Sequence, residues 1–73
     1  MANFAERIKE LRTEEGMTQE ALGKIIGVKR YAVYTYERGL NYPEVRCLIM
    51  LADHFKVSLD YLVGRTDNPE INQ

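Results

Sequence analysis

Basic side chains gather in one short stretch of the sequence, between residues 24 and 38. Four basic residues and a single acid, Glu37, give this stretch a net charge of +3. The basic residues are Lys24, Lys29, Arg30 and Arg38. The whole 73-residue chain has a formal net charge of −1. Because the local field matters more than the total charge at a docking surface, this stretch is predicted to face an anion such as a phosphate.

The spacing within residues 29–38 predicts a helix with one apolar and one polar face. Ala32, Val33 and Tyr36 recur at helical intervals and are expected to face the core. The polar face would then consist of Arg30, Tyr31, Tyr34, Thr35 and Arg38. On such a face an arginine can donate two hydrogen bonds to a guanine, and hydroxyl groups can bond to bases or phosphates. Two alternatives stay open: a strand, on propensity, and a solvated helix face with two exposed tyrosines.

The elements that must position this face are also predicted to be helices, which makes the chain all-α. Asn3 and Glu6 form a capping box before a first helix that ends near Gly16. Thr18 caps a second helix, which ends at Gly27.

Two more helices are predicted in the second half of the chain. Pro43 is expected at the first position of a fourth helix. Ser58 caps a fifth helix, which buries Leu59 and Leu62 and ends at Gly64. The apolar residues of the fourth helix are Val45, Leu48, Ile49, Leu51, Ala52 and Phe55.

Length and composition restrict the classes of protein that this chain can belong to. Seventy-three residues allow one domain, and 45% hydrophobic with 29% charged residues favours a folded one. The single cysteine, Cys47, excludes an internal disulfide framework, and the longest apolar run, Cys47–Ala52, is too short to span a membrane. We therefore expect a soluble, cytoplasmic protein without a membrane partner.

An enzymatic function is not expected from these residues. The chain has one histidine, one serine and one cysteine, and nothing in the sequence indicates that they converge. It also lacks a phosphate-binding glycine loop and any metal-ligand spacing. We predict no catalytic residue, no metal and no cofactor.

Five short motifs follow one another in the sequence with consistent spacing. They are Thr18–Leu22, Ile26–Val28, Tyr36–Gly39, Leu51–Asp53 and Val57–Arg65. Together they closely resemble phage-repressor-type helix-turn-helix proteins, the Cro and lambda-repressor-like (Xre) family of transcription regulators. The resemblance implies a compact five-helix DNA-binding domain over residues 1–66, followed by a polar C-terminal tail over residues 67–73. The polar segment 65–73 is expected to be frayed.

The resemblance also implies a function for the domain. A sequence-specific transcription regulator of this type, a repressor, would bind a palindromic or pseudo-palindromic double-stranded DNA operator as a homodimer. The second and third helices would form the helix-turn-helix, with the third in the major groove. The alternative on the same fold is an antitoxin-like or anti-repressor-like module whose partner is a protein.

The resemblance and the polar face together assign roles to individual residues. Gln19, at the start of the second helix, would hold a DNA phosphate. Arg12 would pair with Glu37 and so tie the first helix to the third. The candidate DNA contacts are Gln19, Lys29, Arg30, Tyr31, Tyr34, Thr35, Arg38, Asn41 and Tyr42.

The sequence departs from the family pattern at three places. Lys29 stands where Ser or Thr usually caps the third helix, which should cost about 1 kcal/mol unless a phosphate lies nearby. Asn41 and Tyr42 stand where relatives often carry a cation, so fewer counterions would be released on binding. Gly23 replaces the usual alanine, at about 1 kcal/mol in helix propensity.

A second surface is predicted near the C-terminus. Met50 occupies an outward position that is usually polar in relatives, with Cys47 and His54 on the same side. The candidate dimer interface is Met50, His54, Leu59, Tyr61 and Val63, with Ile71 adding to the same apolar surface. The alternative is a set of scattered exposed apolar residues, which are common on proteins.

Overall fold

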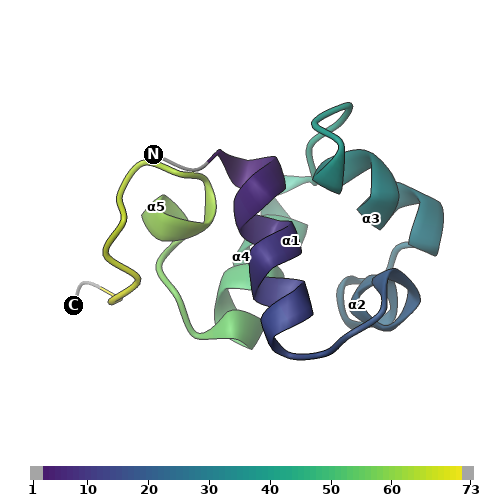
Figure 1. Cartoon of the computed structure of the whole chain (residues 1–73), viewed down its shortest axis with the longest axis horizontal. Helices are drawn as coiled ribbons and strands as arrows, with labels where there is room; N and C mark the ends of the chain where they lie inside the picture. Colours follow the sequence, from purple (N-terminus) through teal and green to yellow (C-terminus); the bar gives the residue numbers. More distant parts are fainter. Residues whose placement is uncertain (1–2, 72–73) are drawn as a thin grey trace.

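Five α-helices follow one another in residues 3–71, the part of the chain that this computed structural model describes (Figure 1). They are α1 (Phe4–Glu14), α2 (Gln19–Ile26), α3 (Arg30–Glu37), α4 (Val45–Phe55) and α5 (Leu59–Leu62). This confirms the predicted all-α, five-helix architecture. α3 packs against α1 and α2, whereas α5 packs against α1 and α4 on the other side of the molecule. No helix in this range is both long enough and apolar enough to cross a membrane.

Short polar side chains begin three of the helices, as predicted. Asn3 Oδ1 accepts a hydrogen bond from Glu6 N at 2.9 Å, and Asn3 N donates to Glu6 Oε1 at 3.5 Å. Thr18 and Ser58 each accept from the backbone N–H three residues further on, at 3.0 Å. These bonds satisfy N–H groups that have no partner inside the helix.

The core is built from one fully buried aliphatic residue of every helix. Ile8, Leu22, Val33, Leu51 and Leu62 have no exposed surface. Tyr36 joins them, and burial raises the pKa of its hydroxyl above the ordinary value. Residues of all five helices thus meet in one core, so the orientation of α3 depends on the other four.

α4 starts later than the sequence predicted. Its N-cap is Glu44, so Pro43 is not at the first helical position. Pro43 is instead buried in the segment before the helix, which runs from Asn41 to Glu44 without regular structure. The preference of proline for a first turn was outweighed here by its packing in the loop.

The exposed face of α4 also differs from the prediction. Val45 and Ile49, predicted among the apolar residues of this helix, are exposed, while Cys47, expected beside Met50, is buried. At 3.6 residues per turn, Val45 lies about 120° and Ile49 about 160° around the helix from the buried Leu51. Cys47 Sγ lies 3.5 Å from a backbone carbonyl oxygen of α2.

The C-terminal segment is tied to α1 by a buried arginine, which the sequence analysis did not single out. Arg7 is only 4% exposed, and its guanidinium lies 3.7 Å from the ring centroid of Tyr61. It donates to the carbonyl oxygens of Tyr61 at 2.8 Å and Thr66 at 3.3 Å, and to Asp67 Oδ1 at 3.1 Å. Ser58 N also donates to Pro69 O at 3.0 Å. The expectation of a frayed tail is therefore wrong for residues 66–69, while residues 72–73 lie outside the described range.

The turn between α2 and α3 closes directly onto Gly23. Val28 N donates to Gly23 O at 2.9 Å, and a Cβ built on Gly23 would lie 2.6 Å from Val28 O. The glycine thus allows a close backbone approach that sets how α3 leaves α2.

We expect Gly23→Ala to lower the free energy of unfolding by about 1–3 kcal/mol, because the new methyl group forces the turn to move. The gain in helix propensity, about 1 kcal/mol, acts in the opposite direction. Urea denaturation measures the difference. Lys24→Ala, at the exposed neighbouring position, is the control and should change stability little. Equal or higher stability of Gly23→Ala would show that the turn relaxes freely.

Candidate nucleic-acid interface

The exposed face of α3 carries two cations and two tyrosines over two helical turns. Tyr31 is 69% exposed, and its ring centroid lies 5.9 Å from that of Tyr34. The guanidinium of Arg38 lies 5.8 Å from the Tyr34 ring, and its Nη1 donates to the tyrosine hydroxyl at 3.4 Å. Arg30 is exposed at the first position of the helix. The structure therefore brings these four predicted residues together on one face.

Thr35 does not belong to this exposed face, contrary to the prediction. The residue is 9% exposed, and its hydroxyl donates to Ala32 O at 2.6 Å. Its burial could not be inferred from its polar side chain alone. In this structure Thr35 offers neither a free hydroxyl nor an exposed surface to a ligand.

Lys29 caps α3 only with its backbone. Its φ and ψ angles are extended, and its side chain makes no capping hydrogen bond within the described residues. The ammonium group is exposed at the end of α3 where the helix dipole is positive. The position therefore combines free N–H donors with a cation, an arrangement that an external anion would stabilise.

A buried ion pair joins α1 to α3, between the two residues expected to pair. Arg12 Nε donates to Glu37 Oε2 at 2.6 Å, and Arg12 Nη2 donates to Glu37 Oε1 at 3.0 Å. The Arg12 side chain is 13% exposed and that of Glu37 only 4%. The hydrogen bonds to Glu37 raise the pKa of the Arg12 guanidinium above its ordinary value, against the opposing effect of burial.

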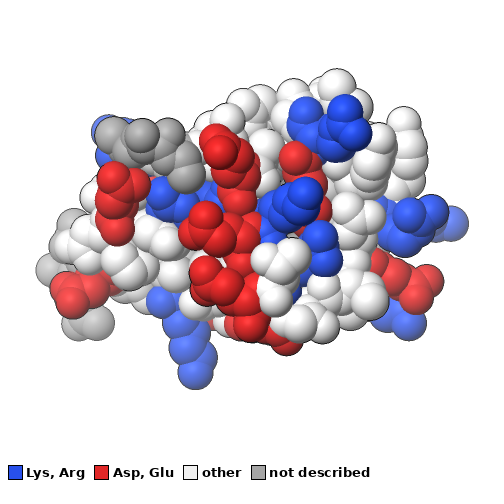
Figure 2. Space-filling model, viewed as in Figure 1, with Lys and Arg blue, Asp and Glu red and all other residues white. Residues whose placement is uncertain are grey.

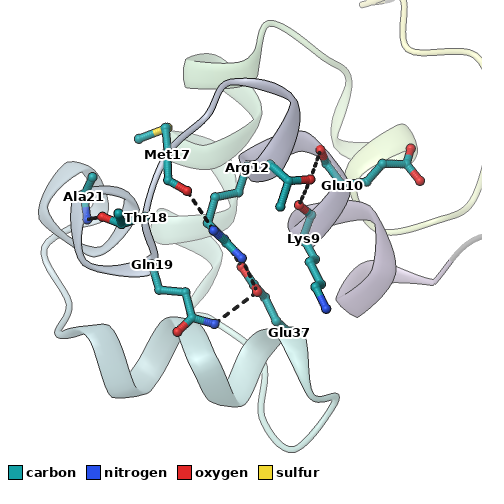
Figure 3. A network of polar contacts seen from close by, with 9 residues as sticks. Lys9, Glu10, Arg12, Met17, Thr18, Gln19, Ala21 and Glu37 are labelled. Atoms are coloured by element: carbon teal, nitrogen blue, oxygen red, sulfur yellow. Dashed lines mark hydrogen bonds and ion pairs between the residues drawn. The ribbon is translucent and has the colours of Figure 1, made fainter.

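The start of α2 is attached to the same ion pair (Figure 3). Arg12 Nη1 donates to Met17 O at 2.7 Å, just before the N-cap of α2. Gln19 Nε2 donates to Glu37 Oε1 at 3.2 Å. Since the amide nitrogen carries two hydrogens, this bond orients Gln19 and leaves a second donor on the same atom. The contact with Glu37 was not predicted.

An open hollow of about 620 Å³ lies where α2 and α3 begin. It is lined by Arg12, Thr18, Gln19, Glu20 and Arg30. Two guanidinium groups, one carboxylate and the N-terminus of α2 therefore border the same space. Since Arg12 is already paired with Glu37, the helix terminus and Arg30 favour an anion there, against one acidic side chain.

Burial of Glu37 changes the charge that residues 24–38 present to solvent. The only acid of this stretch is inside the protein and paired with Arg12, while its four basic residues are exposed. This stretch therefore presents a charge of about +4 to solvent, one more than the net +3 counted from the sequence. In the face drawn in Figure 2, acidic atoms gather over α1, and at the end formed by α2 and α3 blue groups lie on either side of one red group.

The predicted contacts after α3 lie apart from its exposed face. Asn41 and Tyr42 are exposed in the loop that projects between α3 and α4 (Figure 1). The ring of Tyr42 packs on Phe4, with 5.7 Å between centroids, so it lies beside the start of α1. Asn41 has no side-chain hydrogen bond among the described residues.

The predicted dimer residues divide into two groups. Met50 and Leu59 are exposed, as a contact surface requires. His54 Nε2 lies 2.9 Å from Glu15 Oε1, Tyr61 packs under the Arg7 guanidinium, and Val63 is half-buried. The prediction missed two further exposed apolar residues of α4, Val45 and Ile49. Their spacing of four places them on one face of the helix, away from Leu51, and could have indicated their exposure.

Comparison with known proteins identifies the family. A family model described as helix-turn-helix matches residues 8–62. The uncharacterised HTH-type transcriptional regulator YobD of Bacillus subtilis is 33% identical over 67 residues, which cover 92% of this chain. The chain spans about 60% of the length of that relative.

Solved structures of similar fold include repressors. The P22 c2 repressor in complex with a synthetic operator superposes with a TM-score of 0.81 at 33% identity, covering 86% of this chain and 96% of that one. A transcriptional regulator from Listeria innocua gives a TM-score of 0.83 at 30% identity, covering 97% of this chain and 62% of that one. The chain therefore belongs to the helix-turn-helix family, and the resemblance to repressors of the Xre and lambda-repressor type that its motifs predicted is confirmed.

Proposed function

We propose that this protein is a sequence-specific DNA-binding transcription regulator that acts as a repressor. The observation that carries the proposal is the exposed face of α3, which carries cations and tyrosines. No acidic side chain is exposed among residues 24–38. The similarity to an operator-bound repressor supports the same function.

In this proposal α3 is the helix that enters the major groove. An α-helix with its side chains is about 10–12 Å in diameter, which matches the width of that groove. Arg30, at the leading end, would donate to both acceptors of a guanine, and Tyr31 and Tyr34 would contact thymine methyl groups or phosphates. Arg38, at the trailing end, would contact the backbone.

The hollow at the start of α2 would hold a phosphate of the same half-site. Gln19 would donate its second amide hydrogen to the phosphate, and the free N–H groups of α2 would face it. A neighbouring phosphate would also compensate the charge of Lys29 at the N-terminus of α3. Such contacts set the position of the protein on the duplex but do not select a sequence.

A homodimer would be needed for tight binding, because one domain offers few cations. Each neutralised phosphate changes the slope of log affinity against log salt by only about −0.9. Two domains related by a two-fold axis would place their α3 helices in major grooves about 34 Å apart, on a palindromic or pseudo-palindromic operator. Repression would follow from occlusion of the polymerase.

The direct test is selection of bound sequences from a random duplex library at about 150 mM salt, near physiological ionic strength. We expect enrichment of an inverted repeat whose spacing gives the distance between half-sites. Absence of any enriched sequence from protein shown to be helical by circular dichroism would contradict the proposal. It would favour the protein-binding alternative instead.

We expect Arg30→Ala to weaken binding to the selected operator by about 1–3 kcal/mol and to relax the preference at one base pair. Gln19→Ala should weaken binding to all sequences alike, because a phosphate contact carries no sequence information. Fluorescence anisotropy on the operator and on single-base variants separates the two effects. Arg65→Ala, an exposed arginine on the α5 side, is the matched control and should change affinity little. Unchanged base preference in Arg30→Ala would refute its assigned role.

We expect Glu37→Gln to lower the free energy of unfolding by about 3 kcal/mol, because it leaves Arg12 buried without its counter-charge. Under conditions where the variant stays folded, its affinity for all DNA sequences should also fall, as in Gln19→Ala. The double variant Gln19→Ala/Glu37→Gln should then bind no more weakly than Gln19→Ala alone. Additive losses would show that Glu37 does not act through Gln19.

A further inference from the structure

Exposed apolar side chains concentrate on the side of the molecule formed by α4 and the C-terminal segment. Five large apolar residues there are between 36% and 70% exposed. They are Val45, Ile49, Met50, Leu59 and Ile71. Val45, Ile49 and Met50 are exposed because α4 packs its opposite face on α2 and α5.

The exposed apolar stripe of α4, formed by Ile49 and Met50, has a basic residue at one end and an acidic residue at the other. Arg46, Ile49, Met50 and Asp53 are exposed at spacings of three, four and seven, so they lie on one face. Arg46 and Asp53 are about 10.5 Å apart along the axis, with the apolar pair midway between them. Neither charge has an ion-pair partner among residues 3–71.

A hollow lies beside this stripe, between α4, α5 and the C-terminal segment. Its volume is about 460 Å³, and its apolar wall includes Ile49, Val57, Leu59 and Ile71. Leu59 and Ile71 both combine this position with high exposure. The space is large enough for an apolar side chain from a second molecule.

We propose that two copies of this chain pair through antiparallel α4 helices, around a two-fold axis that passes between Ile49 and Met50. The proposal rests on the proposed function, since it specifies the surface of the dimer that would bind an inverted repeat. Residues whose numbers add up to 99 then face one another. Arg46 meets Asp53 of the partner subunit, and Ile49 meets Met50 of the partner subunit.

The charge pattern selects this arrangement among pairings of α4 with itself. A two-fold interface brings the same patch of both copies together, so the patch must be complementary to itself. In the antiparallel register two symmetry-related ion pairs form, each joining Arg46 of one copy to Asp53 of the other, and they flank an apolar centre. A parallel register would place Arg46 against Arg46 and Asp53 against Asp53, which is repulsive. Val45 would extend the apolar contact, and Met50 of the partner subunit would reach the hollow beside Ile49.

Charge reversal tests the register on the full chain, without DNA, by sedimentation equilibrium. Arg46→Glu and Asp53→Arg should each weaken the dimer by about tenfold or more, because like charges then face each other twice. An equimolar mixture of the two variants should form a heterodimer in which both contacts are attractive again. The double variant Arg46→Glu/Asp53→Arg should dimerise like the wild-type chain. Lys9→Glu and Glu10→Lys, exposed on α1, make matching changes of charge and should have no effect.

The outcomes separate the interface from the DNA-binding proposal. A monomeric wild-type chain, single variants that dimerise normally, or a mixture that stays monomeric would each overturn the α4 pairing. Thermal unfolding by circular dichroism checks that the variants fold, as expected for exposed positions. Binding to one isolated half-site should be the same in wild type and in Arg46→Glu, since α3 is untouched. A wild-type chain that binds the half-site but does not dimerise, or single variants that dimerise normally, therefore refute only the interface. A chain that pairs as expected but does not bind the half-site refutes only the function.

Discussion

The buried carboxylate of Glu37 connects three helices, and the arrangement of the proposed DNA-binding surface depends on it. A carboxylate that is 4% exposed is stable only when its charge and its lone pairs are satisfied. Arg12 from α1 supplies the charge in a two-bond geometry, and Gln19 from α2 supplies a further donor. Since the two donors come from α1 and α2, Glu37 fixes the position of the start of α2 and of the end of α3 relative to α1.

The same interaction shapes the electrostatics of the surface. An exposed glutamate at the end of α3 would repel phosphates beside Arg38, whereas a buried and paired one has its charge compensated inside the protein. The chain can therefore be slightly acidic overall and still present four cations without an exposed acid between residues 24 and 38. Its total charge says little about its partner, because the acids that make it negative gather elsewhere, including over α1 (Figure 2).

Local signals in the sequence predicted the helices, their caps and most of the core, because capping and helical periodicity are determined by near neighbours. Apart from the start of α4 and the exposure of Val45 and Ile49, whose spacing was available, the errors concern contacts that a residue makes beyond its own helical turn. Thr35 is polar but buried, Arg7 is charged but buried against the C-terminal segment, and Gly23 is needed where a backbone oxygen approaches. None of these has a signature within a helical turn of its own position. The resemblance to repressors supplied the Arg12–Glu37 pair, but the bond from Gln19 to Glu37 became visible only in the structure.

The exposed face of α3 and the exposed apolar face of α4 both follow from which helices pack on one another in the core. α2 and α3 pack on each other and on α1, which leaves the polar side of α3 free at one end. α4 packs against α2 and α5, which leaves Ile49 and Met50 outside together with Arg46 and Asp53, neither of which has an ion-pair partner in the described part of the chain. Solvent exposure of these apolar groups costs free energy that a second copy would recover, and the charges at either end restrict the orientation in which it can do so. Because α4 and α3 share one rigid core, pairing through α4 would also fix the relation of the two α3 helices, and with it the spacing of the half-sites that a dimer can bind.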